Sequence, residues 1–579
     1  MRVPEITATA ASRHPNRVNR FDAIIIGAGF GGMCLLHKLR EAGLRVLAFD
    51  TASDVGGTWY WNRFPGATTD VESVEYSYSF SDEIQQEWSW SSRYASQPEL
   101  LRYARYVAEK LNLYKDIQFE TRVRSAIYDE IGNEWLIETH RNERFAARFC
   151  VMATGILSVP KKPAIEGIDL FEGEQLHTAR WPLEPVSFKG KRVGIIGTGS
   201  TGIQCIPHIA REAEHLYVFQ RTPNFSIPLR NGPLPPEYEK SVKANYDKWR
   251  RMERRSNTGW IAVDFEPRES DRRSALEVTE EERKAEYEFR WRSGGLCFYN
   301  SFKDLFTDKD ANESVAEFVR SKIRETVRNP AVAELLVPKE YFFGAKRLCA
   351  DTNYFETYNR ANVTLVDVNR SPITGFTPTA VHTGEASYEI DSMVFATGFD
   401  AVTGAMKSID IVGAGGCSLR ERWKNGPKTY LGLMSAGFPN MFMIGGPGSA
   451  FANYFVNIEA NAEWITECIR MMRAHGHTRI QTAPEWEAAW HQTMNNASNR
   501  TLFPSSSSET WFLHREAPGK PRSALMYLGG VKHFVSKLAA VAENGYEGFT
   551  FDCESSRPDE RSAEWRKASA ETDCRQIGF

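Results

Sequence analysis

Two glycine-rich turns in this chain have the GxGxxG spacing that brings a backbone close to a pyrophosphate. Their glycines are Gly27, Gly29, Gly32, Gly197, Gly199 and Gly202. In such a turn the first glycine permits a tight bend, the second lets the phosphates approach, and the third lets the following helix pack on the strand. The N–H groups at the start of that helix then face the phosphates. Two turns of this kind predict two nucleotide sites in one chain.

The residues that end the next apolar run differ between the two turns. Asp50 ends the first run, and a carboxylate there can accept both hydrogen bonds of an unphosphorylated ribose. Arg221 and Thr222 follow the second run, and a guanidinium group can bind a 2′-phosphate. We therefore predict FAD at the first site and NADPH at the second. The polar residues of the second turn that we assign to the NADP site are Thr198, Ser200 and Thr201.

Each turn lies between an apolar strand and a helix. Residues 24–26 are an isoleucine run typical of a buried parallel strand, and residues 45–49 form the next strand. The same order of elements recurs over residues 191–222. Two more apolar runs, at 149–157 and 391–400, pass into Ala-Thr-Gly where the chain is expected to leave or re-enter a nucleotide domain. The pattern predicts an α/β protein with two Rossmann-like dinucleotide-binding domains, for FAD and NADP, and a helical insertion in the NADP domain.

The domain order follows from where these units fall in the chain. A buried run that opens into a Gly-rich loop at 440–450 is expected to close the flavin site from its other side. The charged, helical pattern after the second turn indicates an insertion with solvated faces. The predicted parts are the FAD-binding domain at 20–155 and 389–551, the NADP-binding domain at 156–223 (with a linker) and 339–388, the helical insertion at 224–338, and a polar C-terminal tail at 552–579.

Composition narrows the class of protein. The 579 residues exceed what one hydrophobic core usually holds, and the net charge of −3 offers no field suited to nucleic acid or an anionic membrane. The 9 cysteines form no CxxC pair, so we expect reduced thiols, no metal site and a cytoplasmic location. Neither a signal peptide nor an apolar run of membrane-spanning length is recognisable. We expect a monomer or small homo-oligomer without nucleic-acid or membrane partners.

Three further motifs occur in order along the chain. FEGEQLHTARWP, at 171–182, has the pattern FxGxxxHxxxW followed by Pro. GGTWYWNRFPGATTD, at 56–70, has the pattern GGxWxxxxxPGxxxD, and FFGAKRLCADTNYFETYNRANV, at 343–363, surrounds a Lys-Arg pair. Together with the two glycine turns, these motifs resemble those of the Baeyer–Villiger monooxygenases, a family of class B flavoprotein monooxygenases. The resemblance covers about residues 20 to 550.

The resemblance implies an NADPH- and O2-dependent reaction. NADPH reduces FAD, O2 adds to the reduced flavin, and the flavin peroxide attacks a ketone to give an ester or lactone, with sulfoxidation as a side reaction. By motif match, Arg347 is the fixed cation that stabilises the negative charge of the reaction, and Asp70 orients it. Lys346 is expected to hold the NADP ribose or 2′-phosphate beside Arg221 and Thr222.

The resemblance also implies further cofactor contacts and a substrate pocket. The residues expected at the FAD are Trp59, Asp70, Tyr76, Val123 and Tyr454. Trp511 is expected to contact the nicotinamide half of NADP. The ketone pocket is expected along 449–455 and near Phe503 and Trp511, and Phe451, Tyr454 and Phe455 favour an apolar substrate, whether cyclic, aryl or long-chain.

His177 is the residue of the FxGxxxHxxxW motif with a titratable ring. Its pKa of about 6.5 would suit a general base. Its position between the first Ala-Thr-Gly junction and the second nucleotide unit places it in the link between domains. We therefore predict a hydrogen-bonding hinge residue, with Phe171 and Trp181 anchoring the link by packing.

Three other functions compete with this interpretation. A class B enzyme that oxygenates nitrogen or sulfur shares both nucleotide turns. A flavin disulfide reductase also binds FAD and NADPH, but it needs a redox cysteine pair, and the segment after Gly56 and Gly57 has Trp59 instead. A non-catalytic sensor of NADPH would not need the catalytic positions.

Overall fold

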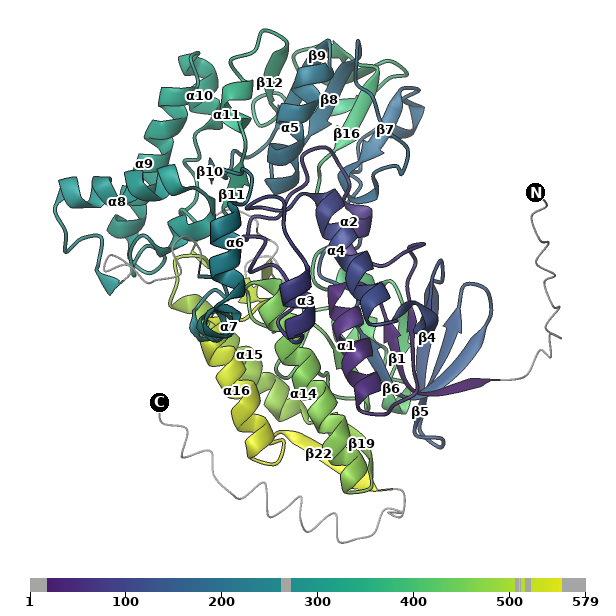
Figure 1. Ribbon diagram of the computed structural model, residues 1–579. Helices are drawn as coiled ribbons and strands as arrows, with labels where there is room; N and C mark the ends of the chain where they lie inside the picture. The colour runs from purple at the N-terminus through teal and green to yellow at the C-terminus, as the bar shows by residue number, and fades with distance from the viewer. Residues whose placement is uncertain (1–17, 262–271, 506–509, 511, 516–521, 554–579) are drawn as a thin grey trace, which may run out of the picture.

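The structure is a computed structural model that describes residues 18–261, 272–505, 510, 512–515 and 522–553. Two sheets dominate it, and the second sheet lies above the first in the view of Figure 1. Helices of the insertion project to one side, and the helices of the last third of the chain cover the first sheet. No helix among the described residues is long and apolar enough to cross a membrane.

The first sheet has eight strands and draws on both ends of the chain. Its strands are β1 (Asn19–Ile26), β2 (Val46–Phe49), β3 (Ile117–Gln118), β4 (Val123–Asp129), β5 (Glu134–Thr139), β6 (Arg144–Met152), β17 (Asp410–Val412) and β18 (Met441–Met443). Their order is β17-β4-β5-β6-β1-β2-β3, and β18 pairs with the end of β6. The pairs around β1 are parallel, and β5 runs antiparallel to both of its neighbours.

The isoleucine run of β1 is buried because both faces of the sheet are covered. Ile25 packs toward α1 (Phe30–Glu41), α14 (Tyr454–Ala474) and α16 (Val531–Glu543). Ile24 and Ile26 point to the opposite face, where Trp135 and Met443 lie, since side chains alternate along a strand. This burial supports the predicted parallel strand.

The second sheet has five strands that are all parallel. Its strands are β7 (Glu174–His177), β8 (Arg192–Ile196), β9 (His215–Gln220), β12 (Val363–Asp367) and β16 (Ser392–Phe395), in the order β12-β9-β8-β16-β7. α5 (Ser200–Glu212) follows β8 and packs on it. Each sheet is therefore a nucleotide-binding type of α/β unit.

One predicted boundary is wrong. We expected residues from 389 on to belong to the first domain, but β16 hydrogen-bonds between β8 and β7 in the second sheet. The second Ala-Thr-Gly junction thus leaves the second sheet, and the chain regains the first sheet at β17. An apolar strand that ends in Ala-Thr-Gly looks the same in either domain, so the sequence pattern could not choose its partner.

Among its described residues, the segment predicted as a helical insertion holds five α-helices. Its helices are α6 (Pro236–Lys243), α7 (Tyr246–Arg255), α8 (Glu280–Ser293), α9 (Lys309–Thr326) and α10 (Pro330–Leu336). α8 begins with a capping box in which Thr279 and Glu282 satisfy each other's backbone N–H, and three glutamates in its first turn favour the helix dipole. α7 returns to the first domain, where it packs against α16.

The remaining elements are short or peripheral. The helices are α2 (Thr58–Trp61), α3 (Asp82–Glu87), α4 (Gln97–Lys110), α11 (Tyr354–Thr357), α12 (Gly404–Lys407), α13 (Leu419–Arg422) and α15 (Pro484–Asn499). The strands are β10 (Ser226–Pro228) with β11 (Cys349–Asp351), β13 (Ile373–Phe376) with β14 (Ala380–Thr383) and β15 (Ser387–Glu389), β19 (His477–Thr482) with β22 (Phe549–Cys553), and β20 (Leu513–Arg515) with β21 (Arg522–Ala524). β22 enters the predicted tail by two residues, and the tail beyond Cys553 lies outside the described residues.

Candidate active site

The first glycine turn opens into a large cleft at the carboxyl end of β1. The cleft encloses about 1210 Å³ of space, a figure that includes the open solvent at its mouth. α1 begins there at Phe30 with Gly29 as its N-cap, and no side chain caps its first N–H groups. A side chain at Gly32 would come within 1.9 Å of the Gly27 carbonyl oxygen, so helix and turn pack closely as the spacing predicts. An uncapped helix start in a cleft suits an anionic group.

Seven of the residues predicted at the FAD line this one cleft. They are Gly27, Gly29, Asp50, Trp59, Tyr76, Val123 and Tyr454. They come from the turns after β1 and β2, from α2 and the loop after it, from β4 and from the start of α14, so segments more than 400 positions apart meet here. Gly32 lies behind the turn rather than on the cleft surface.

Asp50 is held by the backbone around the cleft. Its Oδ2 accepts from the Ala28 N–H at 2.7 Å and its Oδ1 from the Ala52 N–H at 2.8 Å. Burial raises the pKa of Asp50, and these backbone hydrogen bonds oppose that shift. A carboxylate oxygen has room for a second hydrogen bond, so the fixed Asp50 can still accept from a ribose hydroxyl.

Aromatic rings form one wall of the cleft. The Trp59 Nε1 donates to the Tyr76 hydroxyl at 3.2 Å, and the two rings meet edge to face at 5.9 Å. Burial raises the pKa of Tyr76 to about 12, so its hydroxyl stays protonated. A largely apolar aromatic wall of this kind fits a planar ring.

Arg347 and Asp70 form an ion pair beside this wall. The Arg347 Nη2 lies 2.7 Å and 2.5 Å from the two oxygens of Asp70, and their side chains are 27% and 16% exposed. Burial alone would lower the pKa of Arg347, but the charge of Asp70, the hydrogen bond to it and the nearby Tyr299 together raise that pKa above its usual value. The guanidinium is therefore a permanent, fixed positive charge that still has an open face.

Both partners of the ion pair are positioned by contacts with distant segments of the chain. The loop that carries Asp70 is held to α5 of the second domain, where the Gln204 side chain donates to the Thr68 carbonyl at 3.1 Å. Arg347 precedes β11, and the next residue, Leu348, donates its N–H to the Tyr299 hydroxyl at 2.9 Å. The pair thus depends on three separate regions of the chain.

The second glycine turn opens α5 in the same way as the first opens α1. Gly199 is the N-cap of α5, and no side chain caps the helix. The Thr198 hydroxyl donates to the Thr222 carbonyl at 3.1 Å, which ties the turn to the residues that follow β9. Arg221 is exposed there. Ser200 and Thr201 form the first turn of α5.

Tyr341 links Lys346 to this site. The Lys346 Nζ lies 5.6 Å from the centre of the Tyr341 ring, and the Tyr341 hydroxyl donates to the Pro223 carbonyl at 2.9 Å. Lys346 therefore lies near the segment that carries Arg221 and Thr222, as the motif implied.

His177 makes the hydrogen bonds of a link residue. Its Nδ1 accepts from the Ala179 N–H at 3.1 Å, so its Nε2 carries the proton and faces the Lys161 carbonyl at 3.3 Å. It lies at the end of β7, opposite Phe395 of β16, which places it in the second domain's sheet. The neighbouring Thr178 hydroxyl donates to the Phe395 carbonyl at 3.3 Å. The ring thus joins the linker to the second sheet.

A pH prediction follows from this environment. Burial lowers the pKa of His177, whereas the unfolded chain restores a pKa of about 6.5. At a pH between the folded and the unfolded pKa of His177, the unfolded chain binds a proton on this ring and the folded chain does not. The part of the free energy of unfolding that depends on His177 is therefore at its full value above about pH 6.5 and declines as the pH falls below that value. We expect the melting temperature of the natural protein to fall more steeply between pH 7 and pH 5 than that of His177→Gln. Parallel curves would contradict this assignment.

Some predicted residues lie elsewhere. Phe455 does not line a substrate pocket: it is buried in the core, with its ring 4.7 Å from Phe30 and 4.9 Å from Tyr76. Its neighbour Tyr454 faces the cleft, because successive residues of a helix point about 100° apart. Phe451 and Phe503 do approach each other, through Phe512, at 5.5 and 5.8 Å. Trp511 lies outside the described residues.

Arg180 was missed by the sequence analysis. It lines the cleft from the link between domains, stacks on Trp61 at 4.4 Å, and donates to the Ser158 carbonyl at 2.8 Å. Arg122 lines the same cleft. The signal was present, since Arg180 stands between His177 and Trp181 in the FxGxxxHxxxW motif.

Comparison with known proteins identifies the family. Residues 21–228 match the family model described as flavin-binding monooxygenase-like. A cyclohexanone 1,2-monooxygenase of Acinetobacter sp is 42% identical, with 91% of this chain and 96% of the relative covered. A Baeyer–Villiger monooxygenase of Pseudooceanicola batsensis is also 42% identical, over 92% of this chain and 96% of that protein. The chain belongs to the Baeyer–Villiger monooxygenase family.

Two more comparisons bear on this family assignment. A phenazine N-monooxygenase of Lysobacter antibioticus is 43% identical over 92% of this chain and 97% of its own length. The solved structure of OTEMO in complex with FAD and NADP matches with a TM-score of 0.88 and 40% identity, covering 93% of this chain and 100% of OTEMO. These comparisons confirm both the predicted family and the predicted fold class.

Proposed function

We propose that this chain uses NADPH and O2 to convert an apolar ketone into an ester or lactone, with FAD in the first cleft and NADPH on the second turn. The ketone, O2, NADPH and a proton are consumed, and the ester, NADP+ and water are formed. The observation that carries the proposal is the Arg347–Asp70 ion pair, fixed between the cleft and the second domain. The family assignment supports the same reaction.

The residues of the first cleft fit an FAD. The uncapped start of α1 suits the pyrophosphate, Asp50 can accept from the ribose, and the Trp59–Tyr76 wall suits a planar ring. Bound FAD, once reduced by NADPH, supplies the activation of O2. The protein's part is to bind, orient and exclude water.

Arg347 supplies the charge that the ketone reaction needs. When the carbonyl carbon is attacked, negative charge develops on the carbonyl oxygen, and a nearby fixed cation stabilises it without reorganising. Asp70 holds the guanidinium in place, so the stabilisation is built in before the ketone arrives. The aromatic group of Phe451, Phe503 and Phe512 is proposed to exclude water from the ketone pocket, which would strengthen this electrostatic interaction.

On the NADPH side, the proposal rests on chemistry at the second turn. Gly199 offers a side-chain-free approach to the pyrophosphate, while Arg221, Thr222 and Lys346 offer charge and a hydroxyl for the 2′-phosphate. Thr198, Ser200, Thr201 and Gly202 complete this loop and helix start. Trp511 is still proposed at the nicotinamide half.

Oxygenation of nitrogen or sulfur is the second candidate. The phenazine N-monooxygenase is as similar in sequence as the ketone-oxidising relatives. In N-oxygenation an aromatic nitrogen attacks an electrophilic oxygen directly, and no negative charge develops on a carbonyl oxygen. This reaction therefore depends less on a fixed cation than ketone oxidation does. The two candidates can be separated by product.

The test is to purify the protein with FAD and supply NADPH and O2 with a cyclic, an aryl and a long-chain ketone, a thioether and a phenazine. We expect ketone-dependent NADPH consumption matched by ester or lactone. N-oxide or sulfoxide without any ester would transfer the assignment to the heteroatom enzymes. Hydrogen peroxide as the sole product, with every acceptor, would leave neither oxygenation supported.

A further inference from the structure

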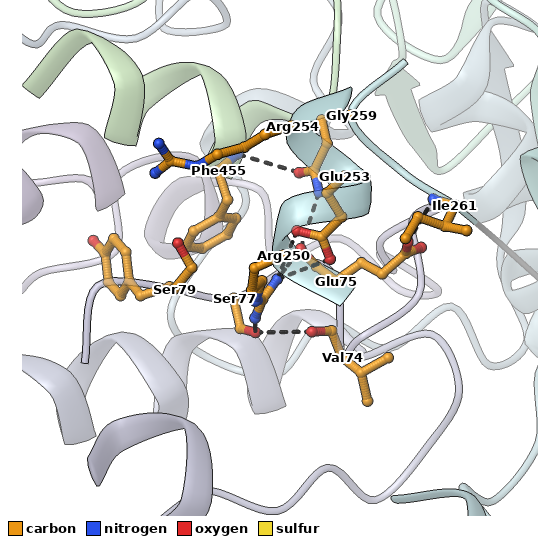
Figure 2. A network of polar contacts seen from close by, with 12 residues as sticks. Val74, Glu75, Ser77, Ser79, Arg250, Glu253, Arg254, Gly259, Ile261 and Phe455 are labelled. Carbon is orange, nitrogen blue, oxygen red and sulfur yellow. Dashed lines mark hydrogen bonds and ion pairs between the residues drawn. The ribbon is translucent and has the colours of Figure 1, made fainter. Parts of the chain in front are cut away.

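The loop that carries Tyr76 is hydrogen-bonded to α7 of the helical insertion. Figure 2 shows Arg250 of α7 pointing toward Glu75 and Ser77, the two neighbours of Tyr76 in the chain. The Arg250 Nη2 donates to the Ser77 hydroxyl at 2.7 Å, and its Nη1 donates to the Glu75 carbonyl at 3.3 Å. The Ser77 hydroxyl in turn donates to the Val74 carbonyl at 3.1 Å. Arg250 thus holds the backbone before Tyr76 at the Glu75 carbonyl and the chain after Tyr76 through the Ser77 hydroxyl.

Arg250 is itself fixed in a buried position. Its side chain is 9% exposed, and its Nη1 lies 3.1 Å from both oxygens of Glu253. Its Nε donates to the Gln85 side chain at 3.0 Å. A buried guanidinium with this many hydrogen-bond partners is held in one orientation, so the position of α7 helps to determine the position of the loop.

The same loop is also hydrogen-bonded to α14 and its N-cap. The Asn453 side chain donates to the Glu75 carbonyl at 2.9 Å, and Glu459 accepts from the Ser79 N–H at 2.6 Å. Tyr76 lies between these two attachments, with its hydroxyl bonded to Trp59 in the cleft wall. Tyr454, at the first turn of α14, lines the same cleft.

We propose that Arg250 is a positioning residue for the flavin cleft, which keeps Tyr76 against Trp59 by holding the Glu75 carbonyl and the Ser77 hydroxyl. The inference rests on the proposed FAD site and extends it to a residue of the insertion. The helical insertion then has a role in cofactor binding, because α7 contacts the loop whose Tyr76 lines the cleft.

Arg254 of the same helix provides a matched control. It also pairs with carboxylates of α14, at 2.8 Å from Glu463 and 3.6 Å from Glu459, and touches the loop only indirectly, through Glu459, which accepts from the Ser79 N–H. Losing either arginine weakens the docking of α7. Loss of Arg250 alone is expected to free the loop beside Tyr76.

The variant must not leave a buried charge unpaired. Removing Arg250 alone would strand Glu253, which is 2% exposed and whose pKa burial already raises to about 7. Arg254 and Glu459 also face Glu253. The double replacement Arg250→Met with Glu253→Gln removes the pair as a unit, which buried ion pairs tolerate better than single losses. Ser77→Ala is a milder second variant that removes only the contact on the loop.

The experiment compares the binding of FAD and the visible absorption of the bound flavin. The apoproteins of the natural chain, the Arg250→Met/Glu253→Gln variant, Ser77→Ala and Arg254→Met are titrated with FAD. We expect the first variant to raise the FAD dissociation constant about tenfold and to shift the flavin absorption. Ser77→Ala is expected to shift it in the same direction, and Arg254→Met to stay within about twofold.

A double-mutant cycle with Tyr76→Phe separates positioning from general destabilisation. If Arg250 acts through Tyr76, the effects of the Arg250 replacement and of Tyr76→Phe on FAD affinity are non-additive. The Arg250 replacement has then already displaced the Tyr76 hydroxyl that Tyr76→Phe removes. Additive effects, or equal effects of the Arg250 and Arg254 variants, would overturn the proposal. A natural chain that binds FAD but forms no ester would refute the proposed reaction while leaving this comparison valid.

Discussion

Replacement of Arg347 with alanine is expected to lower ester formation by about 10²- to 10³-fold, while NADPH still reduces the bound flavin. The reason is that Arg347 is the fixed cation beside the aromatic wall of the cleft, held by both oxygens of Asp70. Its loss removes the stabilisation of the developing oxyanion but leaves the NADP turn and the FAD cleft intact. Stopped-flow absorbance follows flavin reduction, and product analysis follows the ester.

Arg347→Lys is the matched variant for this prediction. It keeps a positive charge but loses the planar fork that can bond Asp70 and still present an open face. We expect an intermediate loss of ester formation. If Arg347→Ala formed ester at the natural rate, the proposed role of the ion pair would be refuted, and oxygenation at nitrogen or sulfur would become the better assignment.

Gly199→Val is expected to raise the NADPH concentration needed for half-maximal flavin reduction by about 10²-fold, since a misplacement of about 1 Å can cost that much. Gly199 has φ −80° and ψ −174°, an extended conformation that valine adopts readily. The nearest protein atom to an added Cβ is the Asn224 Nδ2 at 4.0 Å, so the protein itself has room. Only the pyrophosphate of the nucleotide should be displaced.

The readout separates the two nucleotide sites. The FAD content of Gly199→Val and its reduction by dithionite are expected to match those of the natural protein. Reduction by NADPH is expected to fail at the NADPH concentrations that reduce the natural protein. Gly232→Val is the control, because a side chain at Gly232 meets nothing within 4 Å and Gly232 belongs to neither glycine turn. Loss of FAD in Gly199→Val, or unchanged reduction by NADPH, would contradict the assignment of the second turn.

The sequence by itself determined the two nucleotide turns, the isoleucine strand and the family. These features are local: a glycine turn, its strand and its helix lie within about 30 residues, and their spacing is dictated by backbone geometry. The contrast between Asp50 and Arg221 is equally local, because each residue directly follows its strand. Motif matching then reached Arg347 and Asp70 without showing how they meet.

Only the tertiary structure decided which distant segments share a surface. The sequence could not assign β16 to the second sheet, because its apolar run suits either sheet, and hydrogen bonding to β7 and β8 settles the choice. Nor could it tell that Tyr454 faces the cleft while Phe455 enters the core, since both are aromatic. Arg250 appeared in a charged helical stretch as one more solvated cation. Its burial against Glu253 and the Tyr76 loop exists only once α7 folds back onto the first domain, because long-range packing sets the environment of a charge.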